Sequence, residues 1–201
     1  MKGLSNTAKD ILFGCLLAHL GKSGTDKAYV TFEQTSKHKD YIMHIYELLK
    51  SEGLELLDIK TYQRLDSRYN KINESIYFRT CSSELLFPLL EQFLVDGKKI
   101  LPLNVEEHLN PATLAYWICD DGQLVKNGGV TICTDNFSAV EVNLVVEALA
   151  NRYGLSCSVH NKKGKNGKVY HRVYVKKSSF DVLKPLILPY VHTSFLYKLH
   201  L

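Results

Sequence analysis

The sequence predicts an α+β protein made of two related halves, each with the element order αββαββα and an antiparallel sheet. Two observations support this prediction. A helix, a glycine-containing turn, alternating strands and an amphipathic helix occur twice along the 201 residues. Short segments also recur at a nearly constant spacing, as Val30–Thr31 and Val130–Thr131 do with an offset of 100. Such a period is too long for a solenoid and indicates two copies of one unit related by a pseudo-twofold axis.

The elements of the first half follow from helix-start signals and from the spacing of apolar residues. The predicted order is a helix from Asn6 or Thr7 to about Ala18, a polar turn over 21–26, a strand over 28–34, a helix over 38–53, strands over 54–65 and 74–81, and a helix over 83–95.

The second half repeats this order after a linker that contains glycine, proline and asparagine. We assign residues 1–96 to the first half, 97–112 to the linker and 113–201 to the second half. The predicted elements are a helix from Thr113 to the Asp120–Asp121 pair, a turn over 122–129, a strand over 130–135, a helix over 138–154, strands over 155–162 and 168–177, and a helix over 178–186.

Composition excludes several classes of protein. The five cysteines are widely spaced without a CxxC pair, which argues against a zinc module and a disulfide framework and favours buried thiols in a reducing compartment. The eight histidines form no HxH or HExxH pattern, so a zinc hydrolase has no support. The apolar run from Ile11 to Ala18 is too short to span a bilayer, and we expect no membrane partner.

Cationic side chains gather on the predicted β-hairpins of both halves, although the formal net charge is only +4. Strand alternation predicts that they share one face of each sheet. A lysine-rich strand face also serves solubility and protects sheet edges, but matching hairpins in two repeats favour nucleic acid. The candidate nucleic-acid contacts are Lys60, Arg64, Arg68, Arg79, Lys162, Lys163, Lys168, Arg172 and Lys176.

Two adjacent carboxylates, Asp120 and Asp121, end the apolar helix that opens the second half. The helix dipole disfavours negative charge at this end unless a cation compensates it. A hard metal ion such as Mg²⁺, held by these oxygen ligands, is one interpretation. The alternative is a solvated helix end followed by a turn at Gly122.

The stretch "LAYWICDDG", with "KKILP" and "LNP" before it and "FLYKL" near the C-terminus, resembles the LAGLIDADG homing endonucleases. The resemblance covers nearly the whole chain, and it is strongest to the monomeric double-motif members of organelle introns. It implies a saddle of two antiparallel sheets that binds double-stranded DNA, Mg²⁺-dependent hydrolysis of phosphodiester bonds, and a location in mitochondria or chloroplasts.

The family match also implies roles for individual residues. Asp121 corresponds to the metal-binding acid of the second motif, and Asp120 is its neighbour and a second candidate metal ligand. Lys99 and Lys198 correspond to basic catalytic residues, one from each half. The motif helices pack against each other in this family, and small residues would allow their close approach: Gly14, Cys15 and Ala18 on the first helix, and Ala115 and Cys119 on the second.

The first motif, "ILFGCLLAHLGKS", departs from the family pattern because it lacks the acid. Ala18 and His19 occupy the degenerate position, and a neutral histidine is a poor ligand for magnesium. Three outcomes follow: a weakened or nicking endonuclease, a DNA-binding protein without cleavage, or an RNA-binding intron maturase on the same fold.

Overall fold

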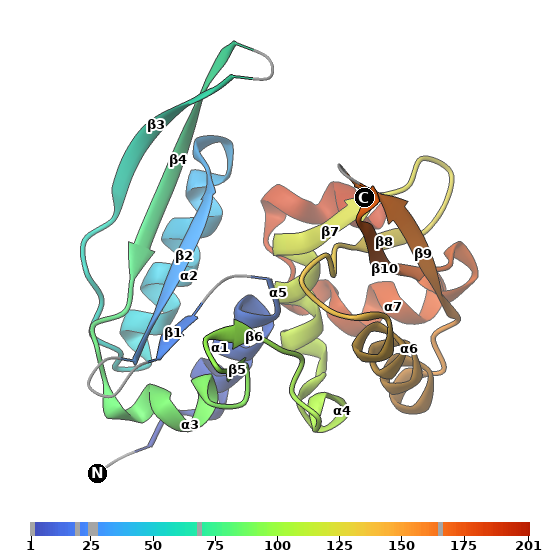
Figure 1. Cartoon of the computed structure of the whole chain (residues 1–201), viewed down its shortest axis with the longest axis horizontal. Helices are drawn as coiled ribbons and strands as arrows, with labels where there is room; N and C mark the ends of the chain where they lie inside the picture. The colour runs from blue at the N-terminus through green and yellow to red at the C-terminus, as the bar shows by residue number, and fades with distance from the viewer. Residues whose placement is uncertain (1–2, 19–20, 24–27, 68–69, 165–166) are drawn as a thin grey trace.

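A computed structural model describes residues 3–18, 21–23, 28–67, 70–164 and 167–201. It has two lobes, each with a four-stranded antiparallel sheet and covering helices (Figure 1). The strand orders are β1-β2-β4-β3 and β7-β8-β10-β9, which place corresponding strands of the two lobes in the same positions. The prediction of an α+β class with antiparallel sheets is confirmed.

Both lobes follow the order αββαββα. The first contains α1 (Asn6–Ala18), β1 (Gly21–Ser23), β2 (Ala28–Thr35), α2 (Lys39–Ser51), β3 (Lys60–Asp66), β4 (Lys71–Arg79) and α3 (Phe87–Leu90). The connection contains β5 (Leu94–Val95), β6 (Lys98–Lys99) and α4 (Val105–His108). The second contains α5 (Pro111–Asp121), β7 (Gly122–Leu124), β8 (Val130–Ile132), α6 (Ala139–Tyr153), β9 (Cys157–Lys163), β10 (Val169–Val175), α7 (Phe180–Ile187) and a 3-10 segment, η6 (Thr193–Leu199).

Several predicted boundaries were wrong. Strands β1 and β7 begin inside the segments predicted to be turns, because each pairs with the strand that follows it. The predicted helix over 83–95 stops at Leu90, since Asp96 and Gly97 adopt positive φ and close the β5–β6 hairpin. Helix α5 starts at Pro111 rather than Thr113, because the Asn110 side chain caps it by accepting from the Thr113 N–H at 2.9 Å.

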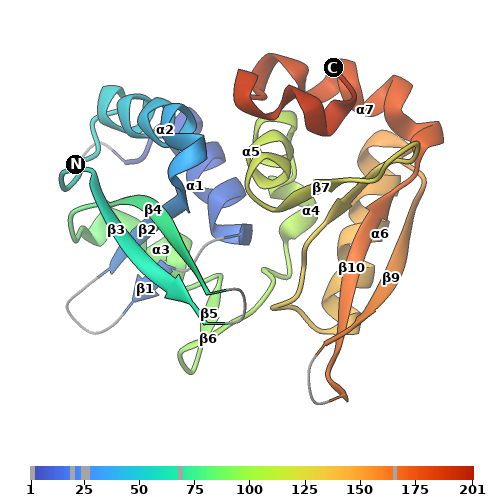
Figure 2. The ribbon, with the colours of Figure 1, turned by 90° about the horizontal axis from the view of Figure 1, so that it is seen from above.

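The first helices of the two lobes, α1 and α5, pack against each other at the centre of the molecule (Figure 2). A Cβ added at Gly14 would lie 2.6 Å from the Thr113 carbonyl oxygen and 2.9 Å from the Tyr116 Cβ. Only a residue without a side chain permits this approach. Ala115 and Cys119 are also fully buried, so the predicted close packing of small residues is confirmed.

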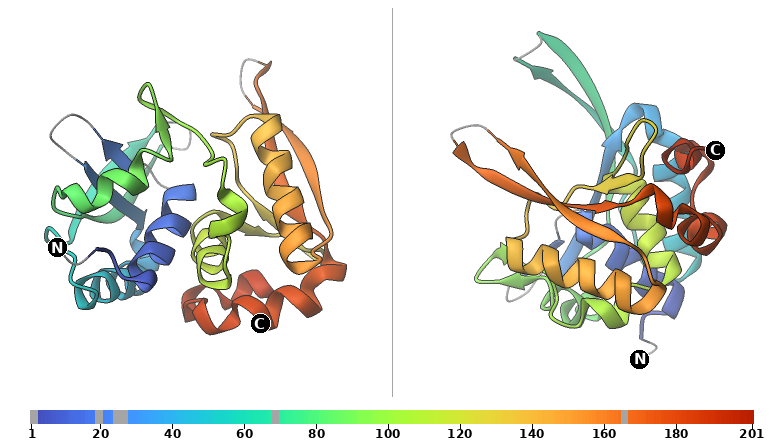
Figure 3. Two further views of the ribbon diagram at one scale, coloured as in Figure 1. Left: turned by 90° about the horizontal axis from the view of Figure 1, so that it is seen from below. Right: turned by 90° about the vertical axis from the view of Figure 1, so that its right-hand side faces the viewer.

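Each sheet buries one face against helices and leaves the other face open. Val30, Phe32 and Phe78 are buried on the side of α2, and Val130 and Val173 are buried on the side of α6. The hairpins β3–β4 and β9–β10 extend beyond these helices on the same side of the molecule (Figure 3). We call the open faces of the two sheets the saddle.

The five cysteines are free thiols, and Cys15 and Cys119 are buried as predicted while the other three are half-buried. Within the described ranges, no helix has the length and apolar character needed to cross a bilayer.

Candidate functional site

The Asp120–Asp121 pair ends α5 directly before Gly122, where the chain enters β7. Both aspartates are half-buried. A Cβ at Gly122 would lie 2.4 Å from the carbonyl oxygen of Ile118, so a glycine is required for the sharp passage from helix to strand. The turn holds the two carboxylates at the junction between the central helices and the second sheet.

A lysine ammonium lies at the C-terminal end of each central helix. Lys99 Nζ donates to the Leu17 carbonyl of α1 at 2.9 Å. Lys198 Nζ donates to the Ile118 and Cys119 carbonyls of α5 at 3.0 and 2.6 Å. Lys99 lies in the connection after the first lobe and Lys198 lies in η6 at the end of the second, and each binds carbonyls in the last turn of a central helix.

Burial and the acid pair act on these lysines in opposite directions. Burial lowers the pKa of Lys99 to about 8, while the nearby charges of Asp121 and Asp120 raise it. Burial likewise lowers the pKa of Lys198, which is 5% exposed, and Cys119, Asp120 and Asp121 oppose the change. Both lysines therefore lie within electrostatic range of the aspartates.

The lysines change the argument drawn from the helix dipole. The sequence interpretation took a metal ion as the cation that compensates two carboxylates at a helix end. Lys99 and Lys198 supply part of that compensation from within the chain. The helix dipole and the acid pair therefore do not by themselves require a metal ion.

The two aspartates differ in their surroundings. Asp120 Oδ1 accepts a hydrogen bond of 2.9 Å from Gln34 Nε2 at the end of β2, in the other lobe. Asp120 also contributes to raised pKa values of Cys15 and Tyr41, for both of which burial is the largest cause. Asp120 is thus directed towards α1, α2 and β2 of the first lobe.

The first half has no carboxylate at the corresponding position. Helix α1 ends at the half-buried Ala18, and β1 begins at Gly21 as β7 begins at Gly122. The residue before the strand glycine is Asp121 in the second half and Leu20 in the first, and no acid occurs between Asp10 and Asp26. His19 lies outside the described residues.

The oxygen chemistry of the junction fits a magnesium ion. In the part of the chain that the structure describes, no group of three His, Cys, Asp or Glu side chains is arranged to hold a metal. Mg²⁺ does not require such a group, since it commonly binds one or two carboxylates together with water and substrate phosphates. Asp121 can supply one such carboxylate.

The cationic residues predicted on the first sheet share its open face. In the β3–β4 register, Lys60 is opposite Tyr77 and Arg64 is opposite Asn73. Tyr77, Asn73 and Arg79 are alternate residues of β4, so their side chains and those of their partners lie on one face. The buried Phe78 alternates with Arg79 and points to the helices. Lys60, Arg64 and Arg79 are exposed, and Arg68 lies outside the described residues.

The second sheet does not collect all its predicted cations on one face. Lys162 pairs with Tyr170 on the open face with Arg172, whereas the next residue, Lys163, points to the opposite face. The expectation of a single basic face was wrong for this pair, because adjacent strand residues alternate. Lys168 and Lys176 are exposed and flank β10.

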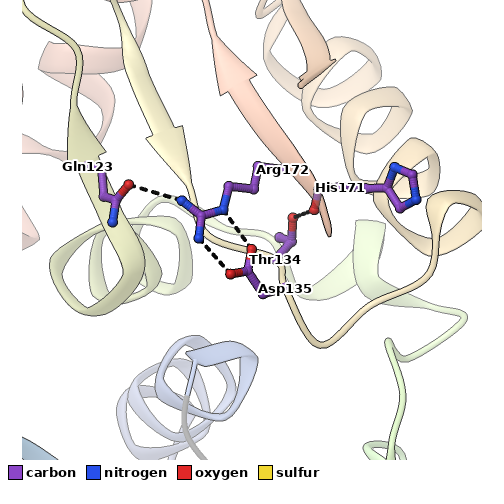
Figure 4. A network of polar contacts seen from close by, with 5 residues as sticks. All are labelled: Gln123, Thr134, Asp135, His171 and Arg172. Atoms are coloured by element: carbon purple, nitrogen blue, oxygen red, sulfur yellow. Dashed lines mark hydrogen bonds and ion pairs between the residues drawn. The ribbon is translucent and has the colours of Figure 1, made fainter. Parts of the chain in front are cut away.

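Arg172 is held in place rather than free (Figure 4). It is 8% exposed, and its Nε and Nη2 donate to both carboxylate oxygens of Asp135 at 2.6 Å. Its Nη1 donates to Gln123 Oε1 at 3.2 Å. Hydrogen bonding to Asp135 is the largest cause of its raised pKa. Sequence reasoning missed Gln34, Gln123 and Asp135, since each acquires its role from a partner distant in the chain.

The geometry defines a class of two-lobed protein. Two central helices pack together beside two open β-sheets, an acid pair ends one of these helices, and a lysine binds the C-terminal end of each. The chain matches the model of the LAGLIDADG DNA endonuclease family over residues 9–183, and it belongs to that family.

Individual relatives agree with this assignment. The chain is 27% identical to the cytochrome b mRNA maturase bI2 of Debaryomyces hansenii. The alignment covers 98% of this chain and 75% of that protein. The chain is 28% identical to the DNA endonuclease I-ChuI of Chlamydomonas applanata. That alignment covers 97% of this chain and 95% of the endonuclease. The homing endonuclease I-WcaI, solved bound to its DNA recognition sequence, has the same fold, with a TM-score of 0.86 at 23% identity over 99% of this chain and 88% of that one.

Proposed function

We propose that the chain is a site-specific, metal-dependent endonuclease for double-stranded DNA that has one complete acidic site. The observation that supports this proposal most directly is the junction at which Asp121 lies within electrostatic range of Lys99 and Lys198. Membership of the LAGLIDADG DNA endonuclease family and the similarity to I-ChuI support the choice of reaction.

In this proposal Asp121 would hold a Mg²⁺ ion. When bound, the ion would supply an activated water and stabilise negative charge on the phosphate during hydrolysis. Lys198 and Lys99 would place positive charge beside the scissile phosphates, each at the end of one central helix, in a partly dry environment where such charge acts strongly. Because both ammonium groups are tied to helix carbonyls, they need little reorganisation when the DNA binds.

Asp120, predicted to be a second metal ligand, has contacts that favour a positioning role. Its hydrogen bond to Gln34 joins α5 to the end of β2 in the other lobe. That bond helps to set the position of the first lobe relative to Asp121. We therefore assign metal binding to Asp121 and positioning to Asp120.

The absence of an acid in the first motif makes the two DNA strands unequal. The half that carries Asp121 retains a carboxylate and a lysine, while the other half retains Lys99 but no carboxylate between residues 10 and 26. Cleavage of one strand follows directly from this arrangement. We propose nicking as the principal reaction.

The saddle is the proposed DNA surface of a monomer. Lys60, Arg64, Arg79 and Lys162 on the open faces, with the flanking Lys168 and Lys176, would neutralise backbone phosphates. We propose an organelle location, in mitochondria or chloroplasts, which the relative named for the cytochrome b mRNA supports. The free thiols agree with a reducing compartment.

A plasmid assay tests the nuclease. Supercoiled plasmid carrying the fused exon junction of the host gene is incubated with the protein, with and without Mg²⁺, and nicked and linear products are measured. We expect Mg²⁺-dependent nicking that Asp121→Asn abolishes and that the exposed control Asp181→Asn retains. Nicking by Asp121→Asn at the wild-type rate would contradict the proposal. Insertion of Gly-Asp between Leu17 and Ala18 should convert nicking into linearisation.

The second candidate function is that of an RNA-binding intron maturase that does not cut DNA. The similarity to the Debaryomyces hansenii maturase over 98% of the chain and the missing first acid favour it. Splicing activity that survives Asp121→Asn, together with no cleavage by the wild type, would select this candidate. Both candidates predict that affinity for nucleic acid falls steeply with salt.

A further inference from the structure

The open face of the second sheet carries a polar network whose chemistry restricts what it can recognise. Arg172 Nε and Nη2 donate to Asp135, and its Nη1 donates to Gln123 Oε1 at 3.2 Å (Figure 4). A guanidinium has donors and no acceptor. The amide of Gln123 must therefore turn its oxygen to Arg172, because its NH₂ group in that place would oppose donor to donor.

Gln123 lies on the open face of the second sheet, close to the end of α5. It follows Asp121 by two residues, and in the β7–β8 register it is opposite Thr131, which in turn is opposite Tyr174 of β10. Tyr174 and Arg172 alternate with the buried Val173 and share the open face. Gln123 is exposed, whereas the two residues that orient it, Arg172 and Asp135, are largely covered.

We propose that Gln123 reads one base pair in the major groove through its NH₂ group alone and thereby selects guanine. Glutamine recognises adenine by accepting from N6 and donating to N7, which requires both ends of the amide. Here the bond from Arg172 uses one lone pair of the oxygen and turns that end of the amide towards the guanidinium, so the NH₂ group is the end presented to a base (Figure 4). Guanine presents two acceptors, N7 and O6, to the remaining donors.

The same geometry gives Arg172 a role other than the predicted direct DNA contact. Its two outer nitrogens and Nε are directed to Asp135 and Gln123 within the sheet. It is a positioning residue that acts through Gln123. Asp135 fixes the guanidinium by a bidentate ion pair, which restricts its rotation.

The inference rests on the proposed DNA-binding function, and its test requires binding without cleavage. The protein selects bound duplexes from a randomised DNA library in EDTA, and sequencing gives the base preference at each position. We expect one position at which the wild type prefers guanine by about fivefold, as the loss of one hydrogen bond implies. Gln123→Glu, which keeps the side-chain shape but presents an acceptor, should shift that position to cytosine.

Two further variants test the orienting role of Arg172 and the specificity of the effect for Gln123. Arg172→Met releases the amide oxygen, so adenine should become acceptable at the same position. Gln63→Glu changes a glutamine that lies on the opposite face of the first sheet and contacts Glu74, and it should leave every preference unchanged. Because Gln123 is exposed, its variant tests the inference even if Arg172→Met fails to fold.

The inference is overturned if Gln123→Glu leaves all positions as in the wild type, or if the position it alters prefers adenine in the wild type. A wild-type protein that selects no duplex sequence overturns both this inference and the DNA-binding function. If the protein does not nick plasmid but still selects guanine at the position that Gln123→Glu alters, the proposed endonuclease activity is contradicted. The inference about Gln123 is then still supported.

Discussion

Replacing Gly14 by alanine tests whether the close approach of α1 and α5 is required. The added Cβ would lie 2.6 Å from the Thr113 carbonyl oxygen, whereas ordinary contact begins at 3.4 Å. The nearest atom belongs to the backbone, so no side-chain rotation relieves the contact and the helices must separate. Overpacking of this kind costs about 1–3 kcal/mol. Higher helix propensity returns up to about 1 kcal/mol.

The net expectation is a destabilisation of about 1–2 kcal/mol, which lowers Tm by roughly 3–6 °C in a chain of this size. Thermal unfolding followed by circular dichroism measures it. Gly3→Ala is the control, because no atom lies within 4 Å of its added Cβ. An unchanged or raised Tm for Gly14→Ala would show that the helices are not in this contact. Nicking should also weaken, since the separation moves Asp121 relative to the first lobe.

Three further outcomes are expected. Burial lowers the pKa of Lys99 to about 8, and its ammonium must be protonated to stabilise the phosphate charge, so the nicking rate should fall as pH rises through 8. In a pH–rate profile, Lys99→Arg should extend activity to higher pH because arginine stays charged. Asp135→Ala should leave the mostly buried guanidinium of Arg172 without its ion pair and lower the free energy of unfolding by about 1–3 kcal/mol in urea titration. Gln34→Ala should slow nicking while leaving the Mg²⁺ concentration for half-maximal rate unchanged, and a shift in that concentration would instead make Asp120 a metal ligand.

Local patterns predicted the parts of the fold that depend on neighbouring residues. The apolar run of α1 and the glycine that ends α6, Gly154 with φ 64°, are readable because periodicity and capping are properties of short segments. Gly14 was readable as a packing residue for a similar reason, since a glycine inside an apolar helix indicates close backbone approach. The residues of β1 and β7 were assigned to turns because three residues are too few to show alternation.

The site was only partly readable because its decisive contacts join distant residues. Gln34 and Asp120 are 86 positions apart, and Arg172 and Gln123 are 49 apart. Nothing in the sequence around Gln123 indicates which end of its amide is occupied. The error for Lys163 has a different cause, since a count of cations ignores the alternation that sends every second side chain to the other face.

The two lysines show why loss of one acid need not dismantle the site. Lys99 binds a carbonyl of α1 just as Lys198 binds carbonyls of α5, although only α5 ends in carboxylates. A buried ammonium without any partner would be costly, but the helix carbonyls and the shared charges of Asp120 and Asp121 offset that cost for both lysines. The first half therefore keeps its cation without an acid of its own. The asymmetry of the sequence is therefore an asymmetry in carboxylates alone, while a lysine is present at the C-terminal end of both central helices.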